Sequence, residues 1–413
     1  MDEQTKEQQQ MGFQHGLSGL NAAARNLDVI GHNVANANTI GAKASRAEFS
    51  EMYATSLYGG ATFNGLGVAV DNVSQQFGQG ELSTTNNPLD LAINGQGFFR
   101  MSDDGAVSFT RNGQFRVNTD GFIVNAQGDH LTGFPADTNG VIQPGVPADL
   151  RIRTGDISPK ASTTMSATLN LDAREAAPTL GFDVADPTTY NSATSLSVFD
   201  EGGRDTTLAL YFRKTATDTW DIYAAADGTQ IGAAAVNTLS FNSDGTLDTV
   251  ASPMPFTLNV PTAAGGTVSL EVEMSQLTQY GSIFGVNDLS QNGFTTGRLA
   301  GFSIGDDGTI MARYTNGQTQ AQGRIALANF ANPQGLSPAG GNAWVETAES
   351  GQPLVGSPGS ASLGSVQSGA VEGSNIDLTG ELVSMITAQR SYQANAQTIR
   401  TQDQVLQTIV NLR

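Results

Sequence analysis

Both ends of the chain carry apolar residues at heptad spacing, and this feature most constrains the fold. Residues that repeat at alternating intervals of four and three positions line one face of a helix and fit a partner helix. The first series, interrupted at Gly31, comprises Phe13, Leu17, Leu20, Ala24, Leu27 and Val34. The second, interrupted at Gln389 and Asp403, comprises Leu378, Leu382, Met385, Tyr392, Ala396, Ile399, Leu406 and Val410. We predict a helix at each end and expect the two to pack together; two independent helices on a β core are the alternative.

The sequence also indicates where these helices begin and end. The N-terminal helix is predicted to end near Asn36, because Asn and Gly tolerate left-handed backbone and cap helices. Ser374 and Asp377 fit the first and fourth positions of a capping box, so the C-terminal helix is predicted to begin at Ser374. Away from the heptad series, both helices carry amides, Ala and Ser where a solvated face has Glu and Lys. We expect these faces to meet other helices; a Gln-rich exposed helix is the alternative.

Between the helices, short β-prone runs alternate with turn signals. Dipeptides that favour the positive φ of hairpin turns are Asn112-Gly113, Asp120-Gly121 and, more weakly, Gln127-Gly128. Residues 101–115 and 304–318 both contain Asp-Asp-Gly, a strand and then Asn-Gly-Gln, so we expect partner hairpins of one domain. Residues 159–288 have strands of their own and are predicted to form an inserted domain.

The predicted fold class is therefore mainly β with α-helical termini. We expect nested, discontinuous domains: a terminal coiled-coil-like helix pair and two β-rich domains. The predicted boundaries are residues 1–40 with 370–413 for the helical domain, 41–86 for a connector, 87–158 with 289–369 for the discontinuous β domain, and 159–288 for the inserted outer β domain.

Composition excludes several classes of partner. The chain has 39 acidic and 20 basic side chains, whereas nucleic acids and anionic membranes attract a positive surface. It contains no cysteine, which excludes disulfides and thiolate metal sites. We find no apolar run long enough for membrane insertion and no signal-peptide pattern at the start. We therefore expect a cytosolic protein, or one exported by a route that does not read such a signal.

The sequence offers no convincing catalytic, cofactor-binding or metal-binding residues. Its histidines, His15, His32 and His130, are scattered without paired-ligand spacing. The acidic pairs at 103–104 and 306–307 each precede Gly within a hairpin pattern, so we interpret them as turns and not as acid–base pairs. The chain is predicted not to be an enzyme.

A family resemblance covers almost the whole chain. Residues 17–43, LSGLNAAARNLDVIGHNVANANTIGAK, resemble the N-terminal signature of the flagellar axial proteins, and residues 373–413 are similar to the terminal helix of that family. The blocks LDLAINGQGFFRM and GRIALANFANPQGL are similar to its hook members. Two departures are Ala42, where the family usually has an aromatic residue, and ten additional residues before Met11. The signature positions present here are Asn33, Asn36, Thr39, Gly41 and Lys43.

The resemblance implies a structural subunit of the bacterial flagellar hook. Such subunits polymerise with themselves into a curved tube that acts as a universal joint and transmits torque from rod to filament. The residues expected to carry polymerisation are those of the two heptad series in the terminal helices. The implied partners are the distal rod protein, the hook cap protein, the hook–filament junction protein and the flagellar type III export apparatus. The implied location is extracellular, in the hook and basal body, after export without a cleaved signal peptide. A distal rod or other axial subunit, a secreted β-rich adhesin and a glycan-cleaving enzyme are the alternatives.

Overall fold

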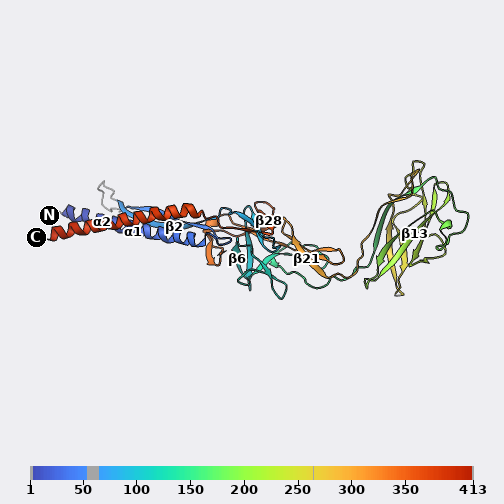
Figure 1. The fold of residues 1–413 in the computed structure, drawn as a ribbon, viewed down its shortest axis with the longest axis horizontal. Helices are drawn as coiled ribbons and strands as arrows, with labels where there is room; N and C mark the ends of the chain where they lie inside the picture. Colours follow the sequence, from blue (N-terminus) through green and yellow to red (C-terminus); the bar gives the residue numbers. More distant parts are fainter. Residues whose placement is uncertain (1–2, 54–64, 264, 412–413) are drawn as a thin grey trace. The chain divides into compact units, whose positions relative to one another are not determined.

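The computed structural model describes residues 3–53, 65–263 and 265–411. The chain forms two compact units (Figure 1). The first contains Met1–Arg153, Phe302–Ala312 and Gln320–Arg413; the second contains Thr154–Gly301 and Arg313–Thr319. In the described residues the α-helices are α1 (Glu3–Asn36) and α2 (Leu378–Asn411), and strands dominate the sequence between them. This confirms the predicted fold class.

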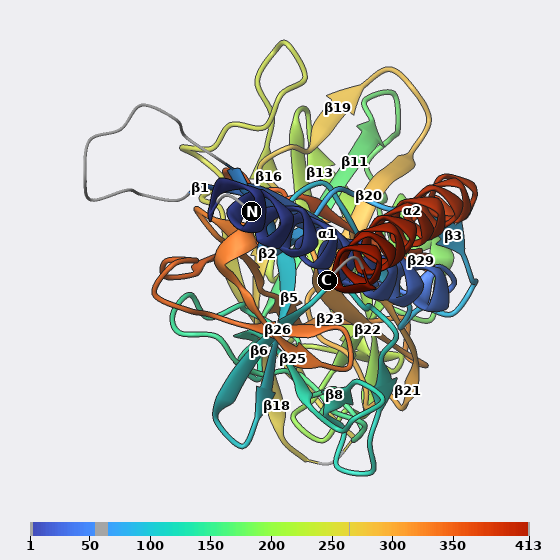
Figure 2. The same cartoon turned by 90° about the vertical axis from the view of Figure 1, so that its left-hand side faces the viewer.

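The two terminal helices lie side by side, as expected (Figure 2). Glycines of α1 allow the close approach. A Cβ atom on Gly16 would lie 3.0 Å from Ile399 Cγ1 of α2, and one on Gly19 would lie 2.8 Å from Asn395 Nδ2. The predicted end of α1 at Asn36 is confirmed.

The predicted start of α2 is wrong by one turn. The helix begins at Leu378, and Asp377 is its N-terminal cap: Asp377 Oδ1 accepts a hydrogen bond of 3.0 Å from the Thr379 amide. Ser374 Oγ instead accepts from the Ile376 amide, before the helix starts. Asp377 occupies the cap because its carboxylate is placed two residues before a free amide of the first turn.

A long antiparallel hairpin follows α1 and packs against it. Its strands are β1 (Ala44–Tyr53) and β2 (Gly65–Gln76), in the region predicted as a connector. The strands pair from Ala44 opposite Gln76 to Tyr53 opposite Gly65, with register shifts at two points. The helices and this hairpin together form the terminal layer of the first unit.

The remaining strands of the first unit belong mainly to a branched sheet with the order β21-β22-β23-β9-β5-β6-β26-β25. These strands are β21 (Leu299–Ile304), β22 (Thr309–Tyr314), β23 (Thr319–Ile325), β9 (His130–Pro135), β5 (Phe98–Asp103), β6 (Ala106–Thr110), β26 (Ala343–Val345) and β25 (Ser337–Gly340). Its branches are β7 (Arg116–Val117), β8 (Ile123–Val124), β10 (Ala148–Asp149), β24 (Leu327–Asn329) and β27 (Leu354–Gly356). Two further ladders join β4 (Leu91–Asn94) to β28 (Ser365–Ser368) and β3 (Leu82–Thr84) to β29 (Ala370–Glu372).

The two Asp-Asp-Gly segments form hairpins of this one sheet, β5–β6 and β21–β22, but they do not pair with each other. Strands β23 and β9 lie between them, so the expectation of partner hairpins is corrected. Asp104 and Gly105 have φ values of 45° and 95°, which confirms the turn interpretation of the first acidic pair. Gly113 is required for a different reason than the predicted turn, because a Cβ atom there would lie 1.6 Å from the backbone oxygen of Leu91.

The second unit is a sandwich of two five-stranded sheets. One contains β11 (Thr164–Asp172), β17 (Phe256–Pro261), β18 (Thr267–Glu273), β19 (Thr278–Tyr280) and β20 (Gly285–Gln291). The other contains β12 (Ser192–Phe199), β13 (Asp205–Ala216), β14 (Thr219–Ala226), β15 (Thr229–Gln230) and β16 (Asn237–Ser240). Short 3₁₀ turns lie at Pro187–Thr189 here and at Pro333–Gly335 in the first unit.

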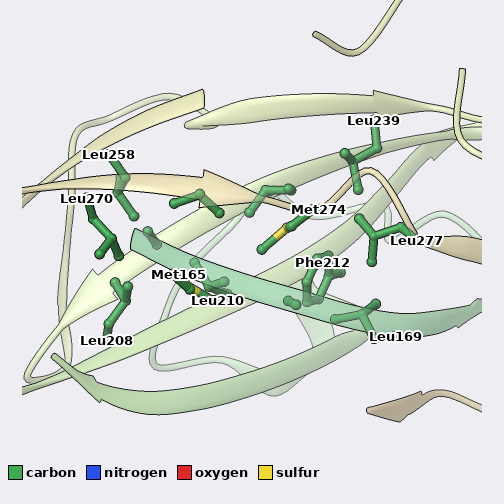
Figure 3. Close-up of a cluster of buried hydrophobic side chains, with 14 of the residues drawn as sticks. Met165, Leu169, Leu208, Leu210, Phe212, Leu239, Leu258, Leu270, Met274 and Leu277 are labelled. Atoms are coloured by element: carbon green, nitrogen blue, oxygen red, sulfur yellow. The ribbon is translucent and has the colours of Figure 1, made fainter. Parts of the chain in front are cut away.

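The core of the sandwich lies between its sheets (Figure 3). Alternate residues of β13 point inward and are fully buried, among them Leu208, Leu210 and Phe212. Trp220 of β14 is also fully buried, and its indole Nε1 donates a 2.7 Å hydrogen bond to Gln279 Oε1. The alternating pattern of this inserted region therefore supplies a core of its own.

Candidate assembly surface

The asparagine-rich end of α1 ties four elements of the chain together. Asn33 is 1% exposed; its Nδ2 donates to the Ser45 carbonyl oxygen at 2.7 Å and to Glu381 Oε1 at 2.9 Å. Its Oδ1 accepts from the Ser45 amide at 2.9 Å. Asn375 makes a similar bridge, accepting from the Ala44 amide and donating to the Gln76 carbonyl oxygen. These amides therefore join α1, both strands of the hairpin and the start of α2.

The other signature positions shape the exit from α1. Asn36 Nδ2 donates to the His32 carbonyl oxygen at 2.9 Å, and the Thr39 hydroxyl donates to Asn36 Oδ1 at 3.3 Å. Gly41 has a φ of 72°, and a Cβ atom there would lie 2.6 Å from the Asn112 amide nitrogen. Only glycine therefore fits at this turn.

Lys43 belongs to a buried group of charges that sequence reasoning did not find. Lys43 Nζ lies 2.6 Å from Glu372 Oε1, and Arg111 Nη1 lies 2.9 Å from Glu372 Oε2. The side chains of Lys43 and Glu372 are fully buried. Burial lowers the pKa of Lys43 below its usual value, and the neighbouring Glu372 carboxylate opposes that change. No local pattern in the sequence pairs these three residues, which lie in segments far apart along the chain.

The structure shifts the row of α1 that faces the rest of the chain by one residue. The covered positions are Gly16, Ala22, Ala23, Ile30 and Asn33, whereas the predicted series has two strongly exposed members. Phe13 is 41% exposed and Leu17 is 44% exposed. Half-buried positions of the predicted series are Leu20, Ala24, Leu27 and Val34. Gly16 in this row, like the nearby Gly19, lets α2 approach the backbone of α1 closely.

The predicted series of α2 is likewise only partly covered within the single chain. Met385 and Ile399 are partly buried, and Ala388, outside the prediction, is buried. Leu378 and Leu382 are 42% and 45% exposed, so each leaves much of its surface uncovered. Ala396 is half-buried and Tyr392 is exposed. The side chains of Leu406 and Val410 lie outside the described residues. The expected helix pair is real, but its contact uses different side chains from several of those predicted.

The displaced apolar residues form surfaces of their own. Along α2, Leu378, Leu382, Val383 and Ile386 are all exposed and follow one another at helical spacing. On the hairpin, Phe49 and Val70 are exposed and paired across the strands, with Met52 and Val73 nearby. A groove of about 570 Å³ separates these elements and is lined by residues including Ala22, Phe49, Val68, Val383 and Ala388. Exposed apolar side chains gathered on neighbouring elements are typical of a protein–protein interface.

In the described part of the chain, no three His, Asp or Glu side chains lie close enough together to hold a metal ion. Neither α1 nor α2, over the residues described, is long and apolar enough to cross a membrane.

Comparison with known proteins gives four family matches in chain order. The flagella basal body rod protein model matches residues 13–43, and the flagellar hook protein FlgE/F/G D1 domain matches 92–168. The flagellar basal body protein FlaE D2 domain matches 170–294, and the flagellar basal body rod FlgEFG protein C-terminal model matches 367–412.

Full-length relatives decide the family. Flagellar hook protein FlgE of Escherichia coli (strain K12) is 42% identical over an alignment 413 residues long. The alignment covers 98% of this chain and 100% of the relative. Flagellar hook protein FlgE of Salmonella typhimurium is 42% identical over 412 residues, with the same coverage. The chain belongs to the flagellar hook protein FlgE family. The resemblance expected from the sequence is thereby confirmed.

The fold agrees with this membership. The crystal structure of Helicobacter pylori flagellar hook protein FlgE2 matches with a TM-score of 0.54 and 13% identity, covering 69% of this chain and 99% of that one. The D2 match of the FlgE family lies inside the second unit, and the two rod matches cover most of α1 and α2. The signature residues Asn33 and Lys43 fall within the N-terminal match.

Proposed function

We propose that this chain is the structural subunit of a bacterial flagellar hook and that it polymerises with copies of itself. The observation that carries the proposal is the 42% identity to flagellar hook proteins over nearly the full length of both chains. The exposed apolar rows of the terminal helices support it, because grouped exposed apolar side chains are typical of a protein–protein interface. The role is structural and not enzymatic.

In the proposed polymer, the terminal helices and hairpin form the contacts of an inner tube. A helical polymer requires two different, complementary faces on each subunit. The exposed row of α2 at residues 378–386 and the exposed positions of α1 and the hairpin are the faces proposed here. We further propose that the β domains predicted from the sequence form the outer part of the tube wall. Residues 87–158 with 289–369 form one of these domains, and residues 159–288 form the outer one.

The proposed mechanical role is that of a universal joint. The tube is curved, connects the rod to the filament and transmits torque while it bends. The proposed partners beyond other copies are the distal rod protein, the hook cap protein and the hook–filament junction protein. The subunit reaches the outside of the cell through the flagellar type III export apparatus, without a cleaved signal peptide.

Complementation of a hook-deficient bacterium tests this function. We expect the chain to restore swimming, and its hooks to be visible on isolated basal bodies by electron microscopy. Leu382→Gln should reduce hook formation, because it places an amide in an apolar contact. The matched control is Leu354→Gln, which makes the same change at a 65% exposed leucine of β27. Failure of the unaltered, exported chain to form hooks would refute the proposal. Equal loss of hooks in both variants would refute the contact role of the α2 row.

A further inference from the structure

The buried charges at Glu372 lie where the helices and hairpin join the rest of the first unit. The chain leaves β2 through residues 77–81, which lead into β3, and returns through residues 373–377, which lead into α2. Residues 37–43 connect α1 to β1 in the same place. We call these three connecting segments the neck. The chain passes between the helices and hairpin and the other β strands of this unit through these three segments, and a further contact joins Gln75 of β2 to Trp344 of β26.

One residue contacts every part of the neck. The Glu372 carbonyl oxygen accepts from the Gly41 amide at 2.9 Å. Its carboxylate Oε1 accepts from Lys43 Nζ at 2.6 Å and from the Gly80 amide at 2.9 Å. Lys43 Nζ also donates to the Gly78 carbonyl oxygen at 2.8 Å. Glu372 is the last residue of β29 and so precedes the returning segment directly.

Arg111 connects Glu372 to the β strands of the unit. Arg111 follows β6, and its Nη1 donates to Glu372 Oε2 at 2.9 Å, while its Nη2 donates to the Gly95 carbonyl oxygen at 2.8 Å. Its guanidinium carbon lies 5.5 Å from the ring centroid of Phe98 in β5. Two cations from separate segments thus meet one carboxylate with no water-exposed side. Buried ion pairs are often no more stabilising than apolar packing, and fixing register is their best attested use.

We propose that Glu372 is a positioning residue that clamps the neck, so that α1 and α2 leave the β strands of the first unit in one fixed direction. Directional, charge-assisted hydrogen bonds suit this role, since they define angles that apolar contacts leave free. The clamp acts within a single subunit and is present before any contact between copies.

The direct test measures a distance distribution in the monomer. The sequence contains no cysteine, so Arg390→Cys on α2 and Ala106→Cys on β6, both exposed, take two nitroxide labels selectively. Double electron–electron resonance should give one narrow distribution for the otherwise unchanged chain. Glu372→Gln should broaden it, because the amide cannot serve both cations. The control Glu81→Gln removes the same charge from an exposed glutamate of the neck and should leave the distribution narrow.

Hydrogen exchange provides a second readout. Glu372→Gln should raise the exchange rate of the Gly80 amide by about tenfold or more, the effect of losing a charge-assisted hydrogen bond to Oε1. The Gly41 amide donates to the backbone carbonyl oxygen of residue 372, so it should exchange faster only because the neck is less firmly held. Amides of the β sandwich should exchange as before. An unchanged distance distribution in Glu372→Gln, or broadening of equal size in Glu81→Gln, overturns the proposal.

If Glu372→Gln prevents the first unit from folding, Lys43→Met decides. It retains the Arg111–Glu372 pair, and the Gly78 carbonyl oxygen keeps its 3.1 Å hydrogen bond from Asn375 Nδ2. It should speed exchange at Gly41 and Ala44 while Gly80 stays protected; wild-type exchange at all three overturns the clamp. Irregular tubes from Lys43→Met would show that the clamp also affects polymerisation; this part of the test rests on the proposed function. The monomer measurements stand whether or not tubes form.

Discussion

Asn33→Ala is predicted to open the junction of α1, β1 and α2 without unfolding either unit. The substitution removes three hydrogen bonds, two to the Ser45 backbone and one to Glu381. Neutral hydrogen bonds contribute about 1 kcal/mol each and one to a charged group somewhat more. Water reaches the partly buried partners after the change, so we expect a local loss of about 2–4 kcal/mol. At 1.4 kcal/mol per decade, that corresponds to roughly 30- to 700-fold faster exchange of the Ser45 amide.

Hydrogen exchange followed by NMR measures that amide directly. Asn38→Ala is the control, because Asn38 is an exposed asparagine of the same segment and should leave Ser45 unchanged. Asn33→Asp should weaken the junction at least as much as alanine at neutral pH, since its carboxylate would face Glu381 at the present 2.9 Å contact. Part of the loss should return in acid, where a protonated carboxyl can donate. Equal exchange at Ser45 in the Asn33→Ala and Asn38→Ala variants would contradict this reasoning.

Three further predictions concern assembly, the sandwich core and acid stability. Truncation from Leu382 onward should leave the chain monomeric by sedimentation at concentrations where the full chain polymerises; tubes from the truncated chain would refute the role of α2. Leu210→Ala, at a fully buried position, should destabilise the second unit by about 2–5 kcal/mol, measured by urea unfolding with Trp220 fluorescence in a Trp344→Phe background; a loss below about 1 kcal/mol would show that the core is not packed as described. Arg174 hydrogen bonds lower the pKa of Asp172 from 3.8 to about 2, so this contribution is present above pH 3.8 and is lost as the pH falls to about 2. Arg174→Gln should therefore lower stability at neutral pH, with a difference from wild type that disappears by about pH 2; a difference independent of pH would exclude this linkage.

Local patterns in the sequence were sufficient to predict strands in the inserted region and a helix at each end, but not the two-sheet arrangement of the second unit. Alternating residues in β13 place Leu208, Leu210 and Phe212 on one face, and a strand period of two requires no distant information. The end of α1 could also be predicted from the sequence, because Asn and Gly readily adopt the left-handed backbone that ends a helix. The start of α2 was not, since Ser374 and Asp377 are both good caps and the sequence does not show which one the backbone uses.

The helix contact shows what local patterns leave open. Each terminal helix has a row of large apolar residues and a row of small ones, and both rows suit a partner. The prediction assigned the large residues Phe13, Leu17 and Leu382 to the contact within the chain, whereas Gly16 and Gly19 occupy it. A subunit that makes contacts with its own chain and with other copies carries two such rows, and periodicity alone does not rank them.

The buried charges required three-dimensional information. Lys43 and Glu372 are separated by 329 residues, and nothing near either position marks them as partners. Asn33 was one of several asparagines in its segment, and only its place on the inner face of α1 distinguishes it from the exposed Asn38. Long-range pairing of this kind follows from the fold and cannot be read from spacing.

A cryo-electron microscopy map of the assembled polymer, at a resolution that shows side chains, tests the central claim most directly. The account predicts a tube in which Leu378, Leu382 and Ile386 of α2, exposed in the single chain, are covered by a neighbouring copy. It also predicts that Gly16 and Gly19 keep their contacts with α2 of the same chain. A tube in which the α2 row faces solvent while copies meet only through the β units would contradict it.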